Sequence, residues 1–302
     1  MDDALQSDSK KMIEDQLQEL PLLPVVVMKM MTLNRDDENY FEEITQLAGQ
    51  DPTFAVRLIR MANSSALATR VPITNLKSAI VRLGTSQIAA LVTSLAVMRI
   101  FVPSSAEARN LWLHSIQTAI AARAIAMMGE TREVTPDDAY LAGLLHDIGR
   151  FILLGTAIEE LKQIDETDWA CPQQLIELEL KLCGFDHAQL GWRICSRWGL
   201  PEQIVEVIRA HHVMDLSGND TREAPLKNLV RITRLADSFS MATLYTSDHR
   251  DDQANIDQAI DTKCTPLLAH DPFVTLEGLQ ATAPAIIAES ERQFAMLGLT
   301  SA

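Results

Sequence analysis

The sequence is poor in aromatic residues, in cysteine and in positive charge. Aromatic residues make up 5% of its 302 residues, whereas twelve are methionine, which favours aliphatic helix packing over a β-sandwich rich in Tyr and Trp. The four cysteines form no Cys-x-x-Cys pair, and we interpret them as reduced thiols. Lys and Arg number 26 against 41 Asp and Glu, and the net charge of −15 disfavours general nucleic-acid binding.

The sequence also lacks a long hydrophobic run. Its longest apolar stretch, residues 91–102, contains Thr93, Ser94 and Arg99 and is shorter than the ~20 apolar residues that cross a bilayer. Residues 1–8 are acidic and polar, unlike a secretory signal or a transit peptide. We therefore expect a cytoplasmic protein with no membrane and no nucleic-acid partner.

What is present is the composition of a packed globular protein, with 47% hydrophobic and 22% charged residues. Nearly every segment has the 3.6-residue spacing of an amphipathic helix, and no clear period-2 strand occurs. Caps and stops bound several helices: Asp51-Pro52 and Thr135-Pro136 each start one, and Gly184 ends another over 172–183. The pattern predicts an all-α protein of many helices.

Three ranges divide the chain in this prediction. The best internal break in the first half is Pro103-Ser104-Ser105, which separates an N-terminal helical subregion, 1–104, from a second helical subregion, 105–246. Residues 247–302 are expected to form a charged loop over 247–257 and amphipathic helices packed on the same globule. Because no long flexible linker occurs, we expect one compact body.

Five of the seven histidines fall between residues 114 and 212. Imidazole together with carboxylate suits iron, manganese, zinc and nickel, and a helical bundle holds an ion by projecting such side chains inward from several helices. The set is rich enough for two ions, which can together activate water for attack on phosphorus. The candidate metal ligands are His114, His146, Asp147, His187, His211, His212 and Asp237.

Four of these candidates form two pairs of adjacent residues, His146-Asp147 and His211-His212, and the direction of their side chains depends on whether a helix continues through each pair. Neighbouring helical residues diverge by about 100°, so His211 and His212 would serve two ions, or one ion plus a substrate. Gly149 is expected to end the helix that carries His146, which frees Asp147 to bridge two ions.

Each candidate also has a purely structural interpretation. These interpretations are a packed core histidine at His114, a hydrogen-bonded helix end at His146 and Asp147, a first-turn residue at His187, dipole stabilisation at His211 and His212, and a pair with Arg231 or Arg234 at Asp237.

The string from Ala142 to Gly149, AGLLHDIG, is similar to the signature of the HD superfamily of metal-dependent phosphohydrolases. More specifically, the chain resembles the HDOD family, the HD-related output domains of bacterial signalling proteins, over about residues 20–213. The supporting motifs, in chain order, are Leu20-Pro21-Leu22-Leu23-Pro24, Asp51-Pro52, Asn63-Ser64, Ala79-Ile80, Leu83-Gly84, Trp112, His114-Ser115, Gly184, His187, Gly191, Trp198, Leu200-Pro201 and His211-His212.

The resemblance implies an HD-domain-like helical bundle with an additional N-terminal helical subregion. The ligand pattern of the related HD-GYP phosphodiesterases, which hydrolyse cyclic dinucleotides at a centre of two or three metals, finds matching residue types at all seven candidate positions. It implies one or two divalent ions, iron or manganese. The chain departs from that pattern at Asn110, where a glutamate is expected, and at Arg150, where a lysine is expected, and no Gly-Tyr-Pro follows Arg150. Asn110 offers no charge, while Arg150 keeps a cation of different shape.

The sequence leaves two functions open beside a purely structural scaffold. The first is a weakly catalytic or non-catalytic output module of bacterial signal transduction, which binds a signalling protein or a small nucleotide ligand. The second is a metal-dependent phosphohydrolase that acts on a nucleotide or cyclic dinucleotide. In that enzyme Asp147 would be catalytic as a metal ligand, and Arg150 would neutralise developing charge.

Overall fold

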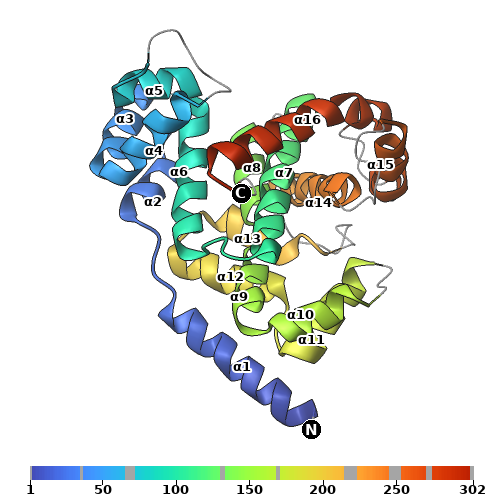
Figure 1. Ribbon diagram of the computed structural model, residues 1–302. Coiled ribbons are helices and arrows are strands. Elements are labelled where there is room, and N and C mark those ends of the chain that lie inside the picture. The colour runs from blue at the N-terminus through green and yellow to red at the C-terminus, as the bar shows by residue number, and fades with distance from the viewer. Residues whose placement is uncertain are drawn as a thin grey trace. The chain divides into compact units, whose positions relative to one another are not determined.

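A computed structural model describes residues 2–34, 37–64, 72–129, 133–167, 171–213, 223–244, 253–269 and 274–299. Within these ranges every regular element is an α-helix (Figure 1), and the all-α prediction is confirmed. In the same ranges no single helix is long and apolar enough to cross a membrane, while two bent helix pairs meet the length and composition test only together.

The chain forms two compact units. The histidine unit comprises residues 1–20 and 104–290, and the small unit comprises residues 21–103 and 291–302. This grouping differs from the three ranges expected from the sequence, because α1 (Asp2–Glu19) packs against α9 and α11 of the histidine unit.

The small unit is a cluster of short helices around a buried apolar core. Asp51 starts one of them, as the sequence predicts: its carboxylate accepts a hydrogen bond from the Thr53 backbone N–H at 2.8 Å and lies 3.0 Å from the Arg99 guanidinium. Phe54, Leu58 and Ile80 are fully buried in this core. Its helices are α2 (Val25–Met31), α3 (Tyr40–Gln50), α4 (Pro52–Ala62), α5 (Leu76–Leu83) and α6 (Thr85–Ile100).

The histidine unit is built around α7 (Ala106–Met128), which packs against α8, α9 and α14. The Ser105 side chain starts α7 by accepting a hydrogen bond from the Ala108 backbone N–H at 3.1 Å. The other helices of this unit are α8 (Pro136–Leu145), α9 (Ile148–Thr156), α10 (Ile158–Asp165), α11 (Pro172–Cys183), α12 (His187–Trp198), α13 (Glu202–Ala210), α14 (Ala224–Leu244) and α15 (Gln253–Leu268), with most of α16 (Leu276–Met296).

The expectation that Gly149 ends a helix is wrong. Helix α8 already ends at Leu145, and α9 begins at Ile148, so Gly149 lies in the first turn of α9. A Cβ atom at residue 149 would lie 2.0 Å from the His187 carbonyl oxygen. The glycine therefore permits the close approach of α9 to the start of α12.

Two segments of the chain are helical where the sequence predicts no helix. The expected loop over 247–257 is wrong for Gln253–Asp257, the start of α15, where the Gln253 amide donates to the Asp257 carboxylate at 2.7 Å, one turn later; residues 247–252 lie outside the described residues. Helix α1 is the second segment, and its sequence has no strong apolar periodicity. Its helical form is stabilised by packing against α9 and α11.

Candidate metal centre

The structure brings all seven predicted ligands together in the histidine unit. Most of them lie at helix ends: His146 and Asp147 form the turn between α8 and α9, His187 begins α12, and His211 and His212 follow the last residue of α13. His114 and Asp237 lie within α7 and α14. His114, His146, Asp147, His187 and His211 are buried.

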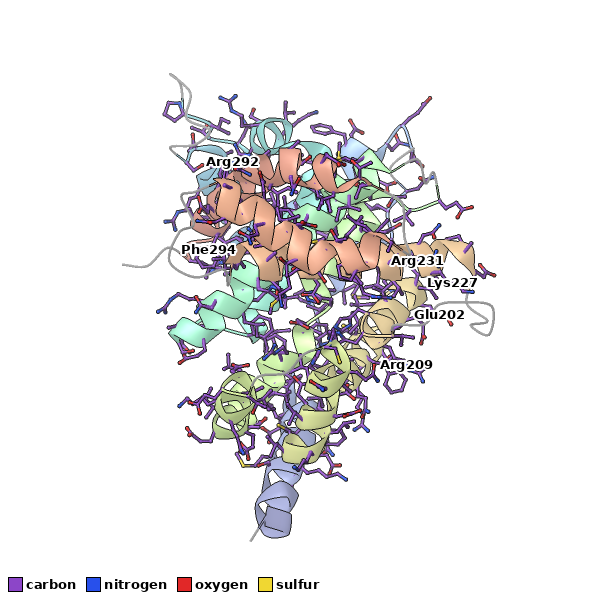
Figure 2. The ribbon with its side chains drawn as sticks, turned by 90° about the vertical axis from the view of Figure 1, so that its right-hand side faces the viewer. Glu202, Arg209, Lys227, Arg231, Arg292 and Phe294 are labelled. Atoms are coloured by element: carbon purple, nitrogen blue, oxygen red, sulfur yellow. The ribbon has the colours of Figure 1, made fainter. Side chains whose placement is uncertain are left out.

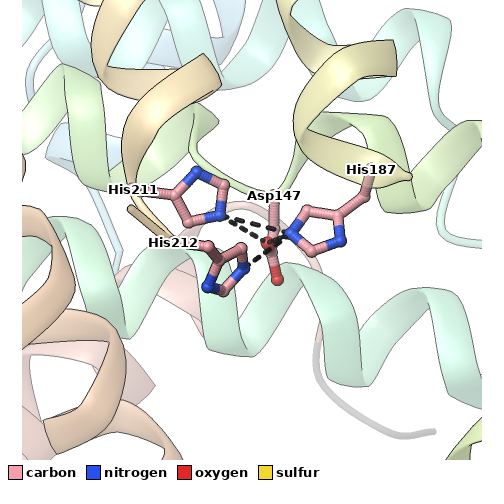
Figure 3. Close-up of side chains that lie close together, drawn as sticks. All are labelled: Asp147, His187, His211 and His212. Atoms are coloured by element: carbon pink, nitrogen blue, oxygen red, sulfur yellow. Dashed lines mark hydrogen bonds and ion pairs between the residues drawn. The ribbon is translucent and has the colours of Figure 1, made fainter. Parts of the chain in front are cut away.

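Three histidines and one aspartate form the first group of potential ligands (Figure 3). The Nε2 atom of His187 lies 3.2 Å from Nε2 of His211 and 2.8 Å from Nε2 of His212. Oδ1 of Asp147 lies 3.2 Å from His187 Nε2 and 3.6 Å from His211 Nε2. Four potential ligand atoms thus surround one small volume.

A second group shares Asp147 with the first. The Nε2 atoms of His114 and His146 lie 3.3 Å apart, and Asp147 Oδ2 lies 3.6 Å from His114 Nε2. Asp237 Oδ1 lies 3.2 Å from His114 Nε2 and 3.7 Å from His146 Nε2. Asp147 contacts both groups, with Oδ1 near His187 and Oδ2 near His114, so its carboxylate belongs to both sets of potential ligands.

The outer nitrogens of four histidines are fixed by hydrogen bonds. His146 Nδ1 donates to the Gly143 carbonyl at 2.8 Å, and His211 Nδ1 donates to the Ile208 carbonyl at 2.6 Å. In the same way, Nδ1 of His187 faces the Glu179 carboxylate at 2.6 Å and Nδ1 of His114 faces the Ser240 hydroxyl at 3.1 Å. With the proton on Nδ1, each neutral imidazole presents the lone pair of Nε2 to the centre.

This arrangement fits a cation. When the imidazoles are neutral, the lone pairs that face one another at 2.8 to 3.3 Å repel, and a positive ion that takes the place of any proton between them removes the repulsion. Ligand atoms bound at about 2.1 Å from one ion lie about 3.0 to 3.4 Å from one another, depending on the coordination geometry. The donor set of imidazoles and carboxylates, without thiolate, suits a divalent transition metal such as iron or manganese.

The electrostatics of the cluster keep its carboxylates ionised. Burial alone would raise the pKa of Asp147, but His146 and His187 outweigh burial and hold this pKa well below its ordinary value. Burial lowers the pKa of His146, yet Asp147 and Asp237 raise it to about 9. Burial and the neighbouring His211 hold the pKa of His212 well below its ordinary value. The ionised aspartates and the neutral His212 are the protonation states that metal binding requires.

Glu179 on α11 is a residue of this site that the sequence analysis misses. It is completely buried, and its Oε2 atom accepts hydrogen bonds from the His187 backbone N–H at 2.9 Å and from His187 Nδ1 at 2.6 Å. A sequence signal exists: Glu179 lies between Leu175 and Cys183 at i and i+4 spacing, in the buried stripe of α11. A carboxylate in such a stripe needs a buried partner.

The structure also decides between the sequence-based interpretations of two residue sets. His211 and His212 follow the end of α13 at Ala210, their ring centres lie 4.0 Å apart, and both belong to one group of potential ligands. Asp237 lies against His114, while the expected alternative partner Arg234 donates to the Val213 carbonyl at 2.9 Å.

A cavity of about 380 Å³ reaches this centre at His114 and Asp147. Both departures from the HD-GYP pattern, Asn110 and Arg150, line the cavity. The Arg150 guanidinium lies 3.2 Å from the Asp165 carboxylate on the same cavity wall. A ligand in this cavity would therefore meet an arginine that already has an acidic partner.

Comparisons with known proteins agree with this fold. The sequence model of the HDOD domain matches residues 20–214. A curated relative, an uncharacterised protein of Treponema pallidum (strain Nichols), is 24% identical over 202 residues, which are 66% of this chain and 39% of that protein. This chain thus spans well under half the length of that relative.

Two solved structures have the same fold. A protein of Shewanella amazonensis SB2B, provisionally named a phosphohydrolase, superposes with a TM-score of 0.67 at 21% identity over 95% of this chain and 98% of its own. A protein of Marinobacter aquaeolei VT8, provisionally named a signal transduction protein, superposes with a TM-score of 0.67 at 18% identity over 97% of this chain and 66% of its own.

Proposed function

This chain belongs to the HDOD domain family, and from that premise we propose that it is an output module of bacterial signal transduction that binds one or two divalent metal ions. In this proposal the histidine unit is weakly catalytic or non-catalytic, and the module acts by binding a signalling protein or a small nucleotide. The observation that carries the metal site is the convergence of histidine Nε2 atoms around Asp147, with the outer nitrogens held by hydrogen bonds.

Each group of ligands has its own supporting shell. His187 is held by Glu179 from both its ring and its backbone. His114 is held by Ser240, whose hydroxyl also lies 3.1 Å from the Gln117 amide oxygen. Such outer contacts fix the orientation and tautomer of ligand histidines. We expect them to keep the site organised for iron or manganese.

The composition of the cavity at Arg150 supports a weak or absent turnover. Its walls carry two cations, Arg150 and Lys162, and three carboxylates, Glu107, Asp147 and Asp165. Both cations lie beside acids, since Lys162 is 3.1 Å from Glu159 and Arg150 is 3.2 Å from Asp165. The paired charges reduce the attraction that the cavity offers to a phosphoester.

The first experiment measures the metal content of protein purified without an affinity metal and under exclusion of oxygen. We expect about one or two equivalents of iron or manganese per chain, and their loss in H146A. As a control, Gln189→Ala changes a nearby side chain that is not a ligand and should retain the metal. Folded protein that contains no metal and cannot be loaded with Fe²⁺ or Mn²⁺ would refute the proposed site.

A second candidate function is a metal-dependent phosphohydrolase acting on a nucleotide or cyclic dinucleotide. It is favoured by the cavity that ends at His114 and Asp147, which belong to the potential ligand groups. Bound divalent ions supply activation of water and polarisation of a phosphoryl oxygen. Arg150 would place its cation beside the phosphoester once it leaves Asp165.

Turnover separates the two candidates. Metal-loaded protein is incubated with nucleoside monophosphates and with cyclic dinucleotides. Release of phosphate is measured for the former, and formation of the linear dinucleotide is measured for the latter. Metal-dependent turnover that D147A abolishes would support the hydrolase and contradict a non-catalytic module. Full metal occupancy with no turnover of these substrates would support the output module.

A further inference from the structure

A second cavity, of about 720 Å³, reaches the metal centre from another side. His212 lines it, whereas the cavity at Arg150 is lined by His114 and Asp147, and no lining residue is common to the two. The Nε2 atom of His212 lies 2.8 Å from that of His187. A molecule in this second cavity, the His212 cavity, would therefore lie next to the ligand group of His187, His211 and His212.

An aromatic side chain faces the His212 cavity. Trp192 on α12 lines the cavity and is 37% exposed, although tryptophan of a helical core is usually well covered. The guanidinium of Arg209 lies over its ring at 5.6 Å from the ring centre, and Figure 2 shows Arg209 at the surface of the histidine unit. The indole is thus partly open to the cavity, with a cation over its ring.

The remaining walls of the cavity supply hydrogen-bonding groups and positive charge. Gln173 and Gln189 contribute amides, which can both donate and accept. Arg193 and Arg209 contribute two guanidinium groups. The one acid on the walls, Asp186, is already the N-cap of α12, where it accepts a hydrogen bond from the Gln189 backbone N–H at 2.7 Å. Arg209 also lies 3.7 Å from the Glu206 carboxylate, whereas the Arg193 guanidinium packs over the Phe185 ring at 4.7 Å from the ring centre. The walls themselves thus carry two guanidinium groups against one carboxylate.

We propose that the His212 cavity binds a nucleoside monophosphate, with the base stacked on Trp192 and the phosphate held by Arg193 and Arg209. Aromatic side chains stack on any nucleobase, and guanidinium groups pair with phosphate in two parallel hydrogen bonds. The volume lies within the range of about 300 to 1,000 Å³ that small-molecule sites have. The proposal rests on the proposed function in naming the ligand class of the output module, but it does not require turnover.

The test is calorimetric titration of AMP and of GMP into the full chain, both after EDTA treatment and after loading with Mn²⁺. Ribose 5-phosphate serves as the matched ligand without a base. Stacking contributes about 1 to 3 kcal/mol per base, which is a factor of about 5 to 150 in Kd. We expect at least one nucleotide to bind more tightly than ribose 5-phosphate by that factor, and W192A to abolish the difference.

Two further variants keep the result interpretable. W192F retains an aromatic face and should restore most of the affinity that W192A loses, which separates stacking from a folding defect. M127A changes another exposed apolar residue, on α7 and outside this cavity, and should bind like the natural chain. Equal affinity of the natural chain and W192A for both nucleotides, or equal affinity for nucleotide and ribose 5-phosphate, would overturn the proposal.

The metal measurement and the nucleotide measurement can each refute one proposal without refuting the other. Nucleotide binding that depends on Trp192 in protein that takes up no metal would refute the proposed metal site and support the cavity. Metal bound at the expected stoichiometry without affinity for AMP or GMP at millimolar concentration would refute the cavity as a nucleotide site.

Discussion

The substitution G149A tests whether the contact between α9 and α12 sets the geometry of the metal centre. A Cβ atom at residue 149 would lie 2.0 Å from the His187 carbonyl oxygen and 2.8 Å from the Gly191 backbone nitrogen. Both neighbours are backbone atoms of α12, so a side-chain rotation cannot relieve the clash. The two helices must move apart, or their backbone must deform locally.

The size of the movement follows from ordinary contact distances. Since unstrained contacts of Cβ begin at 3.4 Å, α9 and the start of α12 must separate by about 1.4 Å, unless the backbone deforms locally. His187 is the first residue of α12, and Asp147 directly precedes α9, so the substitution would displace these two potential ligands relative to each other. Metal sites tolerate deviations of about 0.2 Å in ligand distance.

We therefore expect G149A to lose metal affinity by at least a factor of 10, and overpacking to cost about 1 to 3 kcal/mol of the free energy of unfolding. Affinity is measured by competition with a chromogenic chelator, and stability is measured by urea unfolding. G155A is the matched control in the same helix, because its Cβ would meet only the flexible Gln16 side chain, at 3.3 Å. Natural metal affinity in G149A, with an unchanged urea midpoint, would refute the close-contact argument.

Three further predictions concern the shell of the site, the bound ion and the small unit. E179Q keeps the shape of Glu179 but removes the charge beside His187, so we expect metal affinity to fall by about 10- to 100-fold while the helical circular dichroism signal is retained; an unchanged affinity would contradict a supporting role for this carboxylate. Removal of the ion with EDTA should lower the melting temperature of the natural chain but not that of H146A, since an ion present at 100 times its Kd stabilises the folded state by about 2.7 kcal/mol; equal shifts in both would show that EDTA acts elsewhere. D51A removes the cap of α4 and the partner of Arg99, which should cost about 1 kcal/mol in urea unfolding at pH 7. Although burial acts to raise the pKa of Asp51, hydrogen bonds from Arg99 and Thr53 lower it from its ordinary 3.8, so this stabilisation is present above pH 3.8 and fades as the pH falls through the lower folded value; a difference between D51A and the natural chain that stays constant down to pH 2 would count against it.

Local start and stop signals made much of the helical fold predictable. The prediction of a helix over 172–183 coincides with α11, and the Asp51-Pro52 and Thr135-Pro136 signals coincide with the starts of α4 and α8. In each case the helix boundary is set by a residue within a few positions of it. The Thr135 hydroxyl accepts a hydrogen bond from the Asp138 backbone N–H at the start of α8, and Gly184 adopts a left-handed conformation at the end of α11. Such effects are local and can be deduced from the sequence.

The features that the sequence did not reveal depend on contacts between distant segments. Gly149 is typical of a helix end by composition, but its role is set by the backbone of His187 on another helix. Glu179 looks like the other glutamate of α11, Glu177, until the buried side of that helix is known. In the same way, the hydroxyl of Ser240 meets His114 across 126 residues of sequence. None of these partners follows from spacing along the chain.

The adjacent ligand pairs explain why this site is built at helix ends. Inside a helix, adjacent residues point about 100° apart, so two of them would not bind one ion in the same way. Each pair instead lies where a helix has just ended, after Leu145 and after Ala210, and the first histidine of each pair still has helical backbone angles. The same helix ends leave carbonyl groups without a partner in the helix, and the Gly143 and Ile208 carbonyls accept Nδ1 of His146 and His211. Termination of α8 and α13 therefore supplies the acceptors that orient His146 and His211, so a substitution that extends either helix by one turn would take the acceptor carbonyl into the helix and release the ring.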